Sequence, residues 1–249
     1  MSLVRLTFWG VPVRAVPLAV ARMGLDRIHL RRTPGLRFAK LLGTGDGRTF
    51  TARDADPRRW GLLTVWDDDA AADRFEAGTT HRRWGAFAEE RLDVHLTPVS
   101  ARGRWSRVEP FGNPTPAPTP GPVASITRAR IRPSRMREFW RSVPPVSADL
   151  RAVPGMRLAV GIGEAPIGLQ GTFTIWEGER ALREFAHHRA PHVEAMRAST
   201  DGGWFAEELF ARFRLDRLRG SFAGVDLDSF DRGAEPPGSR AESPDVSAT

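Results

Sequence analysis

A cluster of histidines is the feature of this sequence that most favours metal chemistry. Three of the six histidines lie between residues 187 and 192. Pro191 breaks a continuous helix but suits the first turn of a new one, so we expect helices over Glu179–His187 and over Pro191–Ser199. His192 then lies at a helix start, where the positive end of the helix dipole favours neutral imidazole, the form that ligates a metal.

The remaining histidines carry weaker signals. His188 and His192 are spaced as in a two-histidine metal site, but Pro191 disrupts the shared helical face and no third ligand is suitably placed. Three histidines are isolated in the sequence, and we expect them to be surface residues or satisfied residues of the core: His29, His81 and His95.

Several kinds of catalytic site are excluded. The chain has no cysteine, which excludes thiolate nucleophiles and cysteine-ligated zinc or iron–sulfur centres, and no tyrosine, which excludes tyrosyl chemistry. The chain also has no Gly-x-Ser-x-Gly elbow. We expect Gly43, Gly45, Gly161 and Gly163 to be turn glycines, because they lack the strand-turn-helix context of a phosphate-binding loop.

The net charge of +7 does not by itself indicate nucleic-acid binding. Lys40 is the only lysine, the arginines are scattered, and Asp and Glu are interleaved with them almost everywhere, so we expect no nucleic-acid partner. No apolar run approaches the roughly 20 residues of a membrane-spanning helix, and we expect a cytoplasmic protein. Its arginine-rich surface suits an acidic redox partner or peripheral contact with an anionic membrane.

A repeat organises the chain. Gly35–Ala39 recurs as Gly155–Ala159, each after a proline, and Thr64–Trp66 recurs as Thr174–Trp176. A proline-rich stretch between the copies cannot pair in the interior of a sheet and marks the boundary. We therefore divide the chain into an N-terminal repeat (1–109), a linker (110–122), a C-terminal repeat (123–225) and a polar tail (231–249) that we expect to be disordered.

Each repeat is expected to contain a strand, a helix, two strands, a helical region and a last strand. The expected strands and first helices are Leu3–Val11, Arg14–Gly24, Leu36–Leu42 and Trp60–Trp66, then Val123–Ile131, Ser134–Ala152, Met156–Ile162 and Leu169–Trp176. This order is that of a ferredoxin-like unit, whose antiparallel sheet leaves one face uncovered. We predict an α+β fold in which tandem ferredoxin-like repeats bury these faces in a pseudo-dimeric α+β barrel, with an apolar cavity within or beside it.

The two repeats differ at the histidine of interest. The segment of the first repeat around His81 matches the helix start at Pro191, and Arg82 occupies the position of His192. The sequence therefore predicts a single site, in the second half.

Several strings of residues carry a resemblance to a known family: Ile126–Pro133, Phe139-Trp140, Gly161–Pro166, Gln170–Trp176, Pro191–Ala198, Gly203–Phe213, Leu36–Gly45 and Arg102–Trp105. Through these strings the chain resembles the spheroidene monooxygenase family, the acyclic carotenoid ketolases. The resemblance implies a haem-dependent monooxygenase that oxygenates a carbon of an apolar, carotenoid-like substrate with O₂ and electrons from a donor such as a ferredoxin.

The resemblance also implies roles for particular residues. His192 is the expected axial ligand of the haem iron, and Glu207 or Glu208 would orient its ring through a hydrogen bond. Arg128 would pair with a haem propionate, and Gln170 would donate a hydrogen bond to bound oxygen. Two further aromatic residues would line the haem or substrate cavity: Trp204 and Phe205.

Other functions of the same barrel stay open at this point. One is a haem enzyme with a different small metabolite, either a dehydratase or lyase or a tailoring enzyme. Another is a haem-binding carrier without redox work, and a third is a cofactor-free monooxygenase. The sequence leaves the substrate, the electron donor and the oligomeric state open, a homo-oligomer included.

Overall fold

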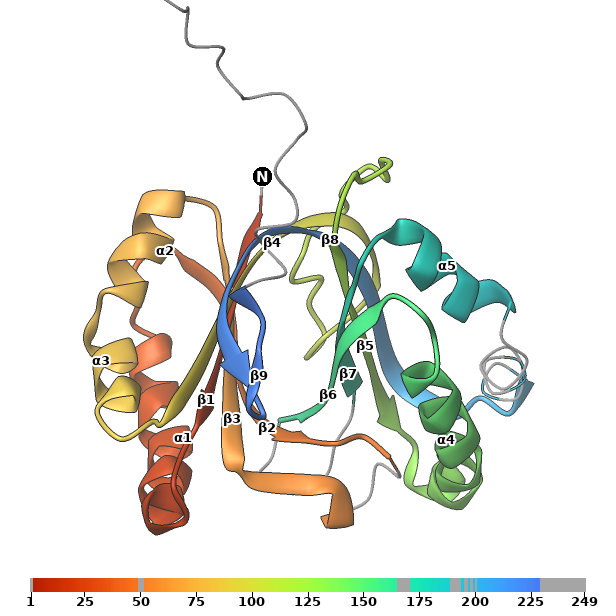
Figure 1. Cartoon of the computed structure of the whole chain (residues 1–249), viewed down its shortest axis with the longest axis horizontal. Coiled ribbons are helices and arrows are strands. Elements are labelled where there is room, and N and C mark those ends of the chain that lie inside the picture. The colour runs from red at the N-terminus through yellow and green to blue at the C-terminus, as the bar shows by residue number, and fades with distance from the viewer. Residues whose placement is uncertain are drawn as a thin grey trace, which may run out of the picture.

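Nine antiparallel strands form one sheet, and helices cover it on two opposite flanks (Figure 1). The computed structural model describes residues 2–48, 52–164, 171–188, 194, 197, 199 and 201–228, without the side chains of Ala52, Arg151, His187 and His188. Its helices are α1 (Val16–Leu30), α2 (Asp69–Glu76), α3 (Thr79–Gly85), α4 (Met136–Arg151) and α5 (Glu179–His188). Its strands are β1 (Leu3–Gly10), β2 (Leu36–Gly45), β3 (Ala55–Trp66), β4 (Glu90–Gly103), β5 (Val123–Ile131), β6 (Met156–Gly163), β7 (Gly171–Trp176), β8 (Phe205–Phe222) and β9 (Val225–Asp226). The predicted mixed α+β class is confirmed.

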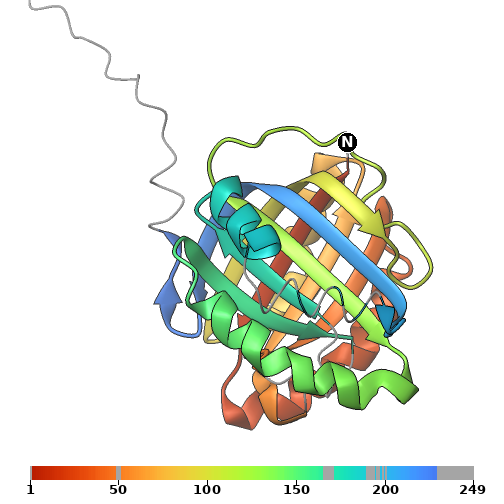
Figure 2. The ribbon, with the colours of Figure 1, turned by 90° about the vertical axis from the view of Figure 1, so that its right-hand side faces the viewer.

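The sheet closes on itself. Hydrogen-bonded neighbours follow the order β4-β1-β3-β2-β6-β7-β5-β8-β9, and β4 also pairs with β8. This second pairing extends from Leu92 opposite Gly220 to Gly103 opposite Leu209. Figure 2 shows the tilted strands of the resulting barrel. Closure gives each of the first eight strands a neighbour on both sides, with β2 and β6 paired through Gly43–Gly45 and Gly161–Gly163.

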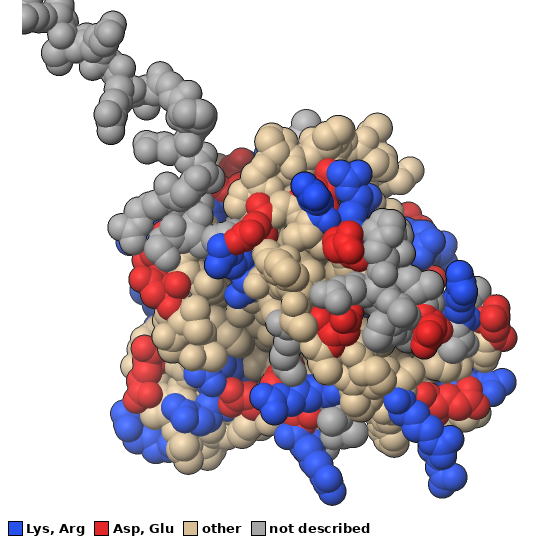
Figure 3. All heavy atoms as spheres, turned by 45° about the vertical axis from the view of Figure 1, so that its right-hand side comes forward, with Lys and Arg blue, Asp and Glu red and all other residues tan. Residues whose placement is uncertain are grey.

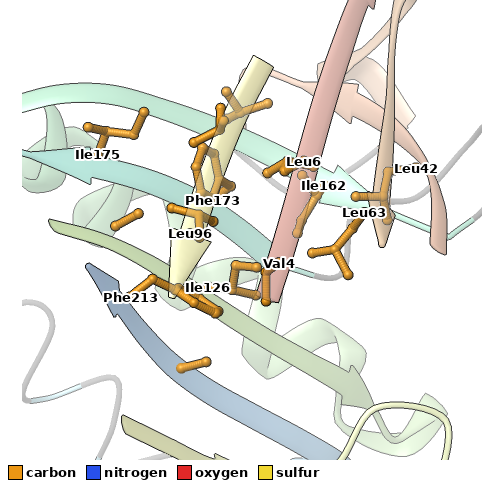
Figure 4. Packing of buried hydrophobic residues seen from close by; sticks show 14 of the residues in the cluster. Val4, Leu6, Leu42, Leu63, Leu96, Ile126, Ile162, Phe173, Ile175 and Phe213 are labelled. Carbon is orange, nitrogen blue, oxygen red and sulfur yellow. The ribbon is translucent and has the colours of Figure 1, made fainter. Parts of the chain in front are cut away.

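Apolar side chains from both halves fill the interior of the barrel. Leu6 and Phe8 of β1 belong to the same buried cluster as Ile126 of β5, Phe173 of β7 and Phe213 of β8. Figure 4 shows such side chains pointing toward one another between the strands. We predicted a cavity within or beside the barrel; because this interior is packed, space for a ligand has to be sought beside it.

The helices lie on the outer side of the barrel. In the first half α1, α2 and α3 pack over β1 and β3, and in the second half α4 and α5 lie over β6, β7 and β5 (Figures 1 and 2). Asp68 shows how the sequence starts one of them: its side chain accepts a hydrogen bond from the Ala70 amide at 3.0 Å and caps α2. The helix predicted over Arg14–Gly24 corresponds to α1, which is longer than predicted because it continues to Leu30.

The prediction of glycine-rich turns is wrong. Gly43 and Gly45 lie in β2, Gly161 and Gly163 lie in β6, and they pair across the barrel as Gly43 with Gly163 and Gly45 with Gly161. The two strands therefore continue beyond the predicted ends and join the first half to the second. Glycine is common in turns, so the neighbouring sequence indicates a turn. Here the glycines are strand residues whose partners lie more than 100 residues away in the chain.

The predicted linker contains no regular secondary structure. Residues 110–122 form neither helix nor strand. Helical residues of the predicted Pro191–Ser199 segment are described at Glu194, Arg197 and Ser199. Tail 231–249 lies outside the described residues, and the domain boundaries stay predictions.

Candidate functional site

The predicted site residues fall into two groups. Gln170 and His192 lie outside the described residues. The other three lie on β5 or at the start of β8: Arg128, Trp204 and Phe205.

The start of β8 connects the helical segment before it to the end of β5. Trp204 is buried, its amide donates a hydrogen bond to the Ser199 carbonyl at 3.1 Å, and its own carbonyl accepts one from the Arg132 amide at 2.8 Å. Phe205 is partly exposed and pairs with Ile131 in the sheet. Trp204 and Phe205 therefore lie where the segment that contains His192 returns to the sheet.

Arg128 is held by two carboxylates. Its guanidinium, 4% exposed, donates to Glu164 at 2.7 Å and forms a short contact with Glu207. Lys40 contacts the other oxygen of Glu164 at 2.5 Å, and the Trp105 indole N–H donates to Glu164 at 2.7 Å. These four charges balance, and they join β2 of the first half to the second half. We call Lys40, Glu164, Arg128 and Glu207 the barrel-end cluster.

Both carboxyl groups of the barrel-end cluster are stabilised in the ionised form. Burial alone would raise the pKa of Glu164, but Lys40, Trp105 and Arg128 together hold it below its usual value. Burial likewise opposes ionisation of Glu207, and the amides of Arg107 and Ser106 and the Arg128 guanidinium outweigh it, so that this pKa is also lowered. Because both pKa values are lowered, Glu164 and Glu207 carry negative charges at neutral pH and pair with Lys40 and Arg128.

Arg128 faces the interior of the barrel. In the first half Phe8 lies opposite Gly61, and in the second half Arg128 lies opposite Gly171 at the same register. Phe8 belongs to the barrel core, so side-chain alternation places Arg128 on that side and away from the helices. The propionate contact of Arg128 stays a prediction, and it would add a third carboxylate to a cluster with two cations.

In the first half, large side chains fill the space between the sheet and its helices. Trp9, Leu41 and Leu62 are buried on this outer face, and Trp84 of α3 stacks on Trp9 with ring centroids 5.0 Å apart. The Trp84 indole N–H donates to buried Asp26 at 2.9 Å. This side of the first half is a packed core without room for a ligand.

The second half has small side chains at the same places. Strand registers match Trp9, Leu41 and Leu62 of the first half to Ala129, Gly161 and Thr172 of the second. The face that bears Ala129, Gly161 and Thr172 is named the small-residue face below. It lies under α4 and α5 (Figure 2) and lacks the indole and isobutyl groups that fill its counterpart. The side chains at these three positions are therefore smaller than those at the matching positions of the first half.

Sequence reasoning missed these small residues and the barrel-end cluster. A residue-by-residue comparison of the two repeats would have shown tryptophan and leucine replaced by alanine, glycine and threonine. Lys40 was marked only by being the single lysine of the chain. Its contact with Glu164 bridges residues 124 positions apart, which no local pattern indicates.

The two candidate carboxylates for orienting His192 are on different sides of β8. Glu207 accepts hydrogen bonds from the Ser106 and Arg107 amides at 3.0 and 2.7 Å and is occupied at the end of the barrel. Glu208 lies opposite Ala129, on the strand position that alternation assigns to the small-residue face. Of the two, Glu208 is therefore the one placed on the side of the helices.

The isolated histidines have different surroundings. His29 is exposed, and His95 contacts Glu76 at 3.2 Å. His81 is buried against Trp9 and Phe75, with its Nε2 3.3 Å from the Thr7 hydroxyl. Burial, with a further contribution from the Arg91 charge, lowers the pKa of His81 to about 4.

His81 should make the fold sensitive to mild acid. Its folded-state pKa of about 4 lies below the usual 6.5, so the unfolded chain takes up the proton first and stability falls as pH drops. We expect the free energy of unfolding to fall by about 2 kcal/mol between pH 6.5 and 5, measured by chemical denaturation. His81→Phe should flatten this slope, and His29→Phe controls for the loss of one imidazole. An equal slope in His81→Phe would contradict the assignment.

A surface cavity of about 430 Å³ lies on the first-half side of the barrel. Its lining includes Glu76, Arg91, Asp93, His95, Arg217 and Arg219, so charged groups surround it. Such a lining does not suit an apolar substrate. Within the described part of the chain, no group of three or more histidine or acidic side chains is placed to hold a metal ion.

Charges of both signs are interspersed on the face shown in Figure 3, where no patch of one sign dominates. None of the helices described here is long and apolar enough to cross a membrane.

The comparisons with known proteins agree on the family. No family model matches the chain. The chain is 39% identical to a spheroidene monooxygenase from Rhodobacter capsulatus over 215 residues, covering 85% of this chain and 89% of the relative. It is 42% identical to a spheroidene monooxygenase from Rubrivivax gelatinosus over 195 residues, covering 77% and 73% of the two chains. The fold is similar to that of an aldoxime dehydratase crystallised with butyraldoxime, with a TM-score of 0.55, 11% identity and coverage of 92% and 84%. The chain therefore belongs to the spheroidene monooxygenase family and is an oxidoreductase of the monooxygenase class.

Proposed function

We propose that this protein is a haem-dependent monooxygenase that oxygenates a carbon of a carotenoid-like, apolar substrate. The relatives are named for spheroidene, and substrate class is carried over from that name. The product would be an alcohol and, after a second hydroxylation at the same carbon, a ketone. Each turnover takes one O₂, two protons and two electrons from an external donor such as a ferredoxin, and releases one water. The second hydroxylation gives a gem-diol, which loses a further water to form the ketone.

The observation that carries the haem assignment is the small-residue face. A porphyrin is flat and largely apolar, and Ala129, Gly161 and Thr172 are smaller than Trp9, Leu41 and Leu62, which hold the matching positions of the first half. The residues present therefore fit such a group in the second half and not in the first. The single candidate histidine, His192, also belongs to the second half.

The proposed residue roles are those that the family resemblance implies. His192 would ligate the iron with its imidazole, and Glu208 would accept a hydrogen bond from the other ring nitrogen. Trp204 and Phe205 would line the site, and the Gln170 amide would donate a hydrogen bond on the side where O₂ enters. Haem iron supplies the oxygen chemistry when bound.

We also infer that residues 1–109 and 123–225 are two ferredoxin-like repeats. Support comes from the order of the strands in the sheet. It is β4-β1-β3-β2 in the first half and β8-β5-β7-β6 in the second. In each half, the fourth strand of that half lies beside its first, followed by its third and its second. The matched registers of β1 with β3 and of β5 with β7 also support it. In this view the second repeat kept a site that the first repeat filled with side chains.

An absorption spectrum of protein produced with ample haem tests the proposal. We expect a Soret band in the wild type, a lost or shifted band in His192→Ala, and an unchanged band in His188→Ala, the matched control. With electron donor and an acyclic carotenoid, isotopically labelled O₂ should label the product. A wild type without a Soret band, or turnover that leaves the product unlabelled, would overturn the proposal.

A further inference from the structure

Helix α1 has an unpartnered apolar face. Its inner side is buried in the first-half core through Ala19, Met23, Asp26 and Leu30. The opposite side carries the apolar residues that remain exposed, with Leu25 58% and Ile28 57% exposed. The exposed apolar face, as used below, consists of Leu18, Ala21, Leu25 and Ile28.

The spacing of these residues makes them one continuous stripe. Positions 18, 21, 25 and 28 follow the three- and four-residue steps that return to the same side of a helix. Positions 19, 23, 26 and 30 follow the same rule for the buried side. Exposed Val13 precedes the helix, in a short 3₁₀ turn. Because the helix already packs well through its inner side, this outer stripe is not needed for folding.

Exposed arginines lie around the stripe, and one of them, Arg14, faces the exposed Glu89 at 3.8 Å. Arg14 precedes the helix, Arg27 lies within it, and Arg31 and Arg32 follow it, all four exposed. The only acidic residue of α1, Asp26, is 1% exposed. Neither Arg31 nor Arg32 forms an ion pair with any residue that the structure describes. The outer surface of α1 is therefore both apolar and cationic.

We propose that the exposed apolar face of α1 docks on a lipid surface that carries anionic headgroups. Apolar side chains would enter the boundary between headgroups and acyl chains while the arginines contact the headgroups. A second copy of the chain is a poorer occupant, because an isologous contact through this face would bring Arg27, Arg31 and Arg32 of both copies together. The inference rests on exposed side chains alone and is independent of the proposed haem.

Vesicle binding of the full chain tests this docking. We expect the wild type to sediment with vesicles of phosphatidylcholine that contain a quarter phosphatidylglycerol, more than with pure phosphatidylcholine, and less as NaCl is raised. Leu25→Asp with Ile28→Asp should lower the partition coefficient on the order of tenfold or more, because two exposed apolar groups that would enter the lipid boundary become charged. Arg31→Glu with Arg32→Glu should lower it for anionic vesicles only.

The controls separate the lipid surface from other occupants. Val225→Asp, at a position 55% exposed in the β8–β9 hairpin, should bind vesicles as the wild type does. Circular dichroism and thermal melts should show that each variant is folded. Equal binding to neutral and anionic vesicles, or wild-type binding by Leu25→Asp with Ile28→Asp, would overturn the proposal. A concentration-dependent dimer that these substitutions abolish, without vesicle binding, would make α1 an interface between copies and would also overturn it.

Discussion

Ala129→Trp combined with Gly161→Leu is expected to weaken haem binding by more than about tenfold, and to lower oxygenation with it, in a protein that still folds. The two substitutions place on the second half the residues that the first half has at the same register, Trp9 and Leu41. In the first half those side chains are accommodated between sheet and helices, so the fold tolerates them there. On the second half they would occupy the space that we assign to the porphyrin.

The measurement is a haem titration followed at the Soret band, with a thermal melt of the same preparation. We expect the apparent affinity to fall by more than about tenfold, while the unfolding transition stays cooperative. Ala77→Trp, at an exposed position after α2, is the matched control for the added indole and should bind haem normally. A double variant that binds haem with wild-type affinity would place the cofactor somewhere other than the small-residue face.

Arg128→Met is expected to destabilise the protein by about 3–5 kcal/mol. Its guanidinium is 4% exposed, and its removal leaves Glu164 and Glu207 largely buried with one cation fewer. Chemical denaturation at pH 7 measures the loss. Arg135→Met removes an exposed pair with Glu138, 3.0 Å long, and should cost less than about 1 kcal/mol.

A second substitution shows whether the buried charges cause the loss. In Arg128→Met with Glu207→Gln the uncompensated carboxylate is gone, so part of the stability should return. Glu207 has a lowered pKa, so its contribution is present above the usual value of 4.5 and is lost as pH falls through the folded-state pKa. The wild type and Glu207→Gln should therefore converge in stability in acid. If Arg128→Met cost no more than Arg135→Met, the barrel-end cluster would have no structural role.

The small-residue face and the barrel-end cluster both bear on the proposed haem site. The small-residue face concerns where a cofactor fits, and the barrel-end cluster concerns what holds β5, β6 and β8 together beside it. Glu164 directly follows β6, and Arg128 lies opposite Gly171, the first residue of β7. In the chain, Gln170 lies between Glu164 and Gly171. Loss of the cluster should therefore affect the site through the position of the strands.

The amino-acid sequence by itself determined the order of helices and strands, the mixed α+β class and the family. These depend on local properties: alternating apolar residues in Leu3–Gly10, the caps and prolines around the helices, and the long matching string at Gly203–Phe213. Each of these patterns depends on residues that are close together in the chain, so it can be recognised without the folded structure.

Only the tertiary structure decided which faces are filled and which charges meet. Gly43 and Gly163 look like turn residues until β2 pairs with β6, and Arg128 looks like an exposed strand arginine until Glu207 lies beside it. The strand registers, which match Ala129 to Trp9, show that the small residues of the second half share one face of the sheet. The physical reason is that pairing and packing join residues far apart in the chain, and the free energy of such contacts depends on a partner that local sequence does not specify.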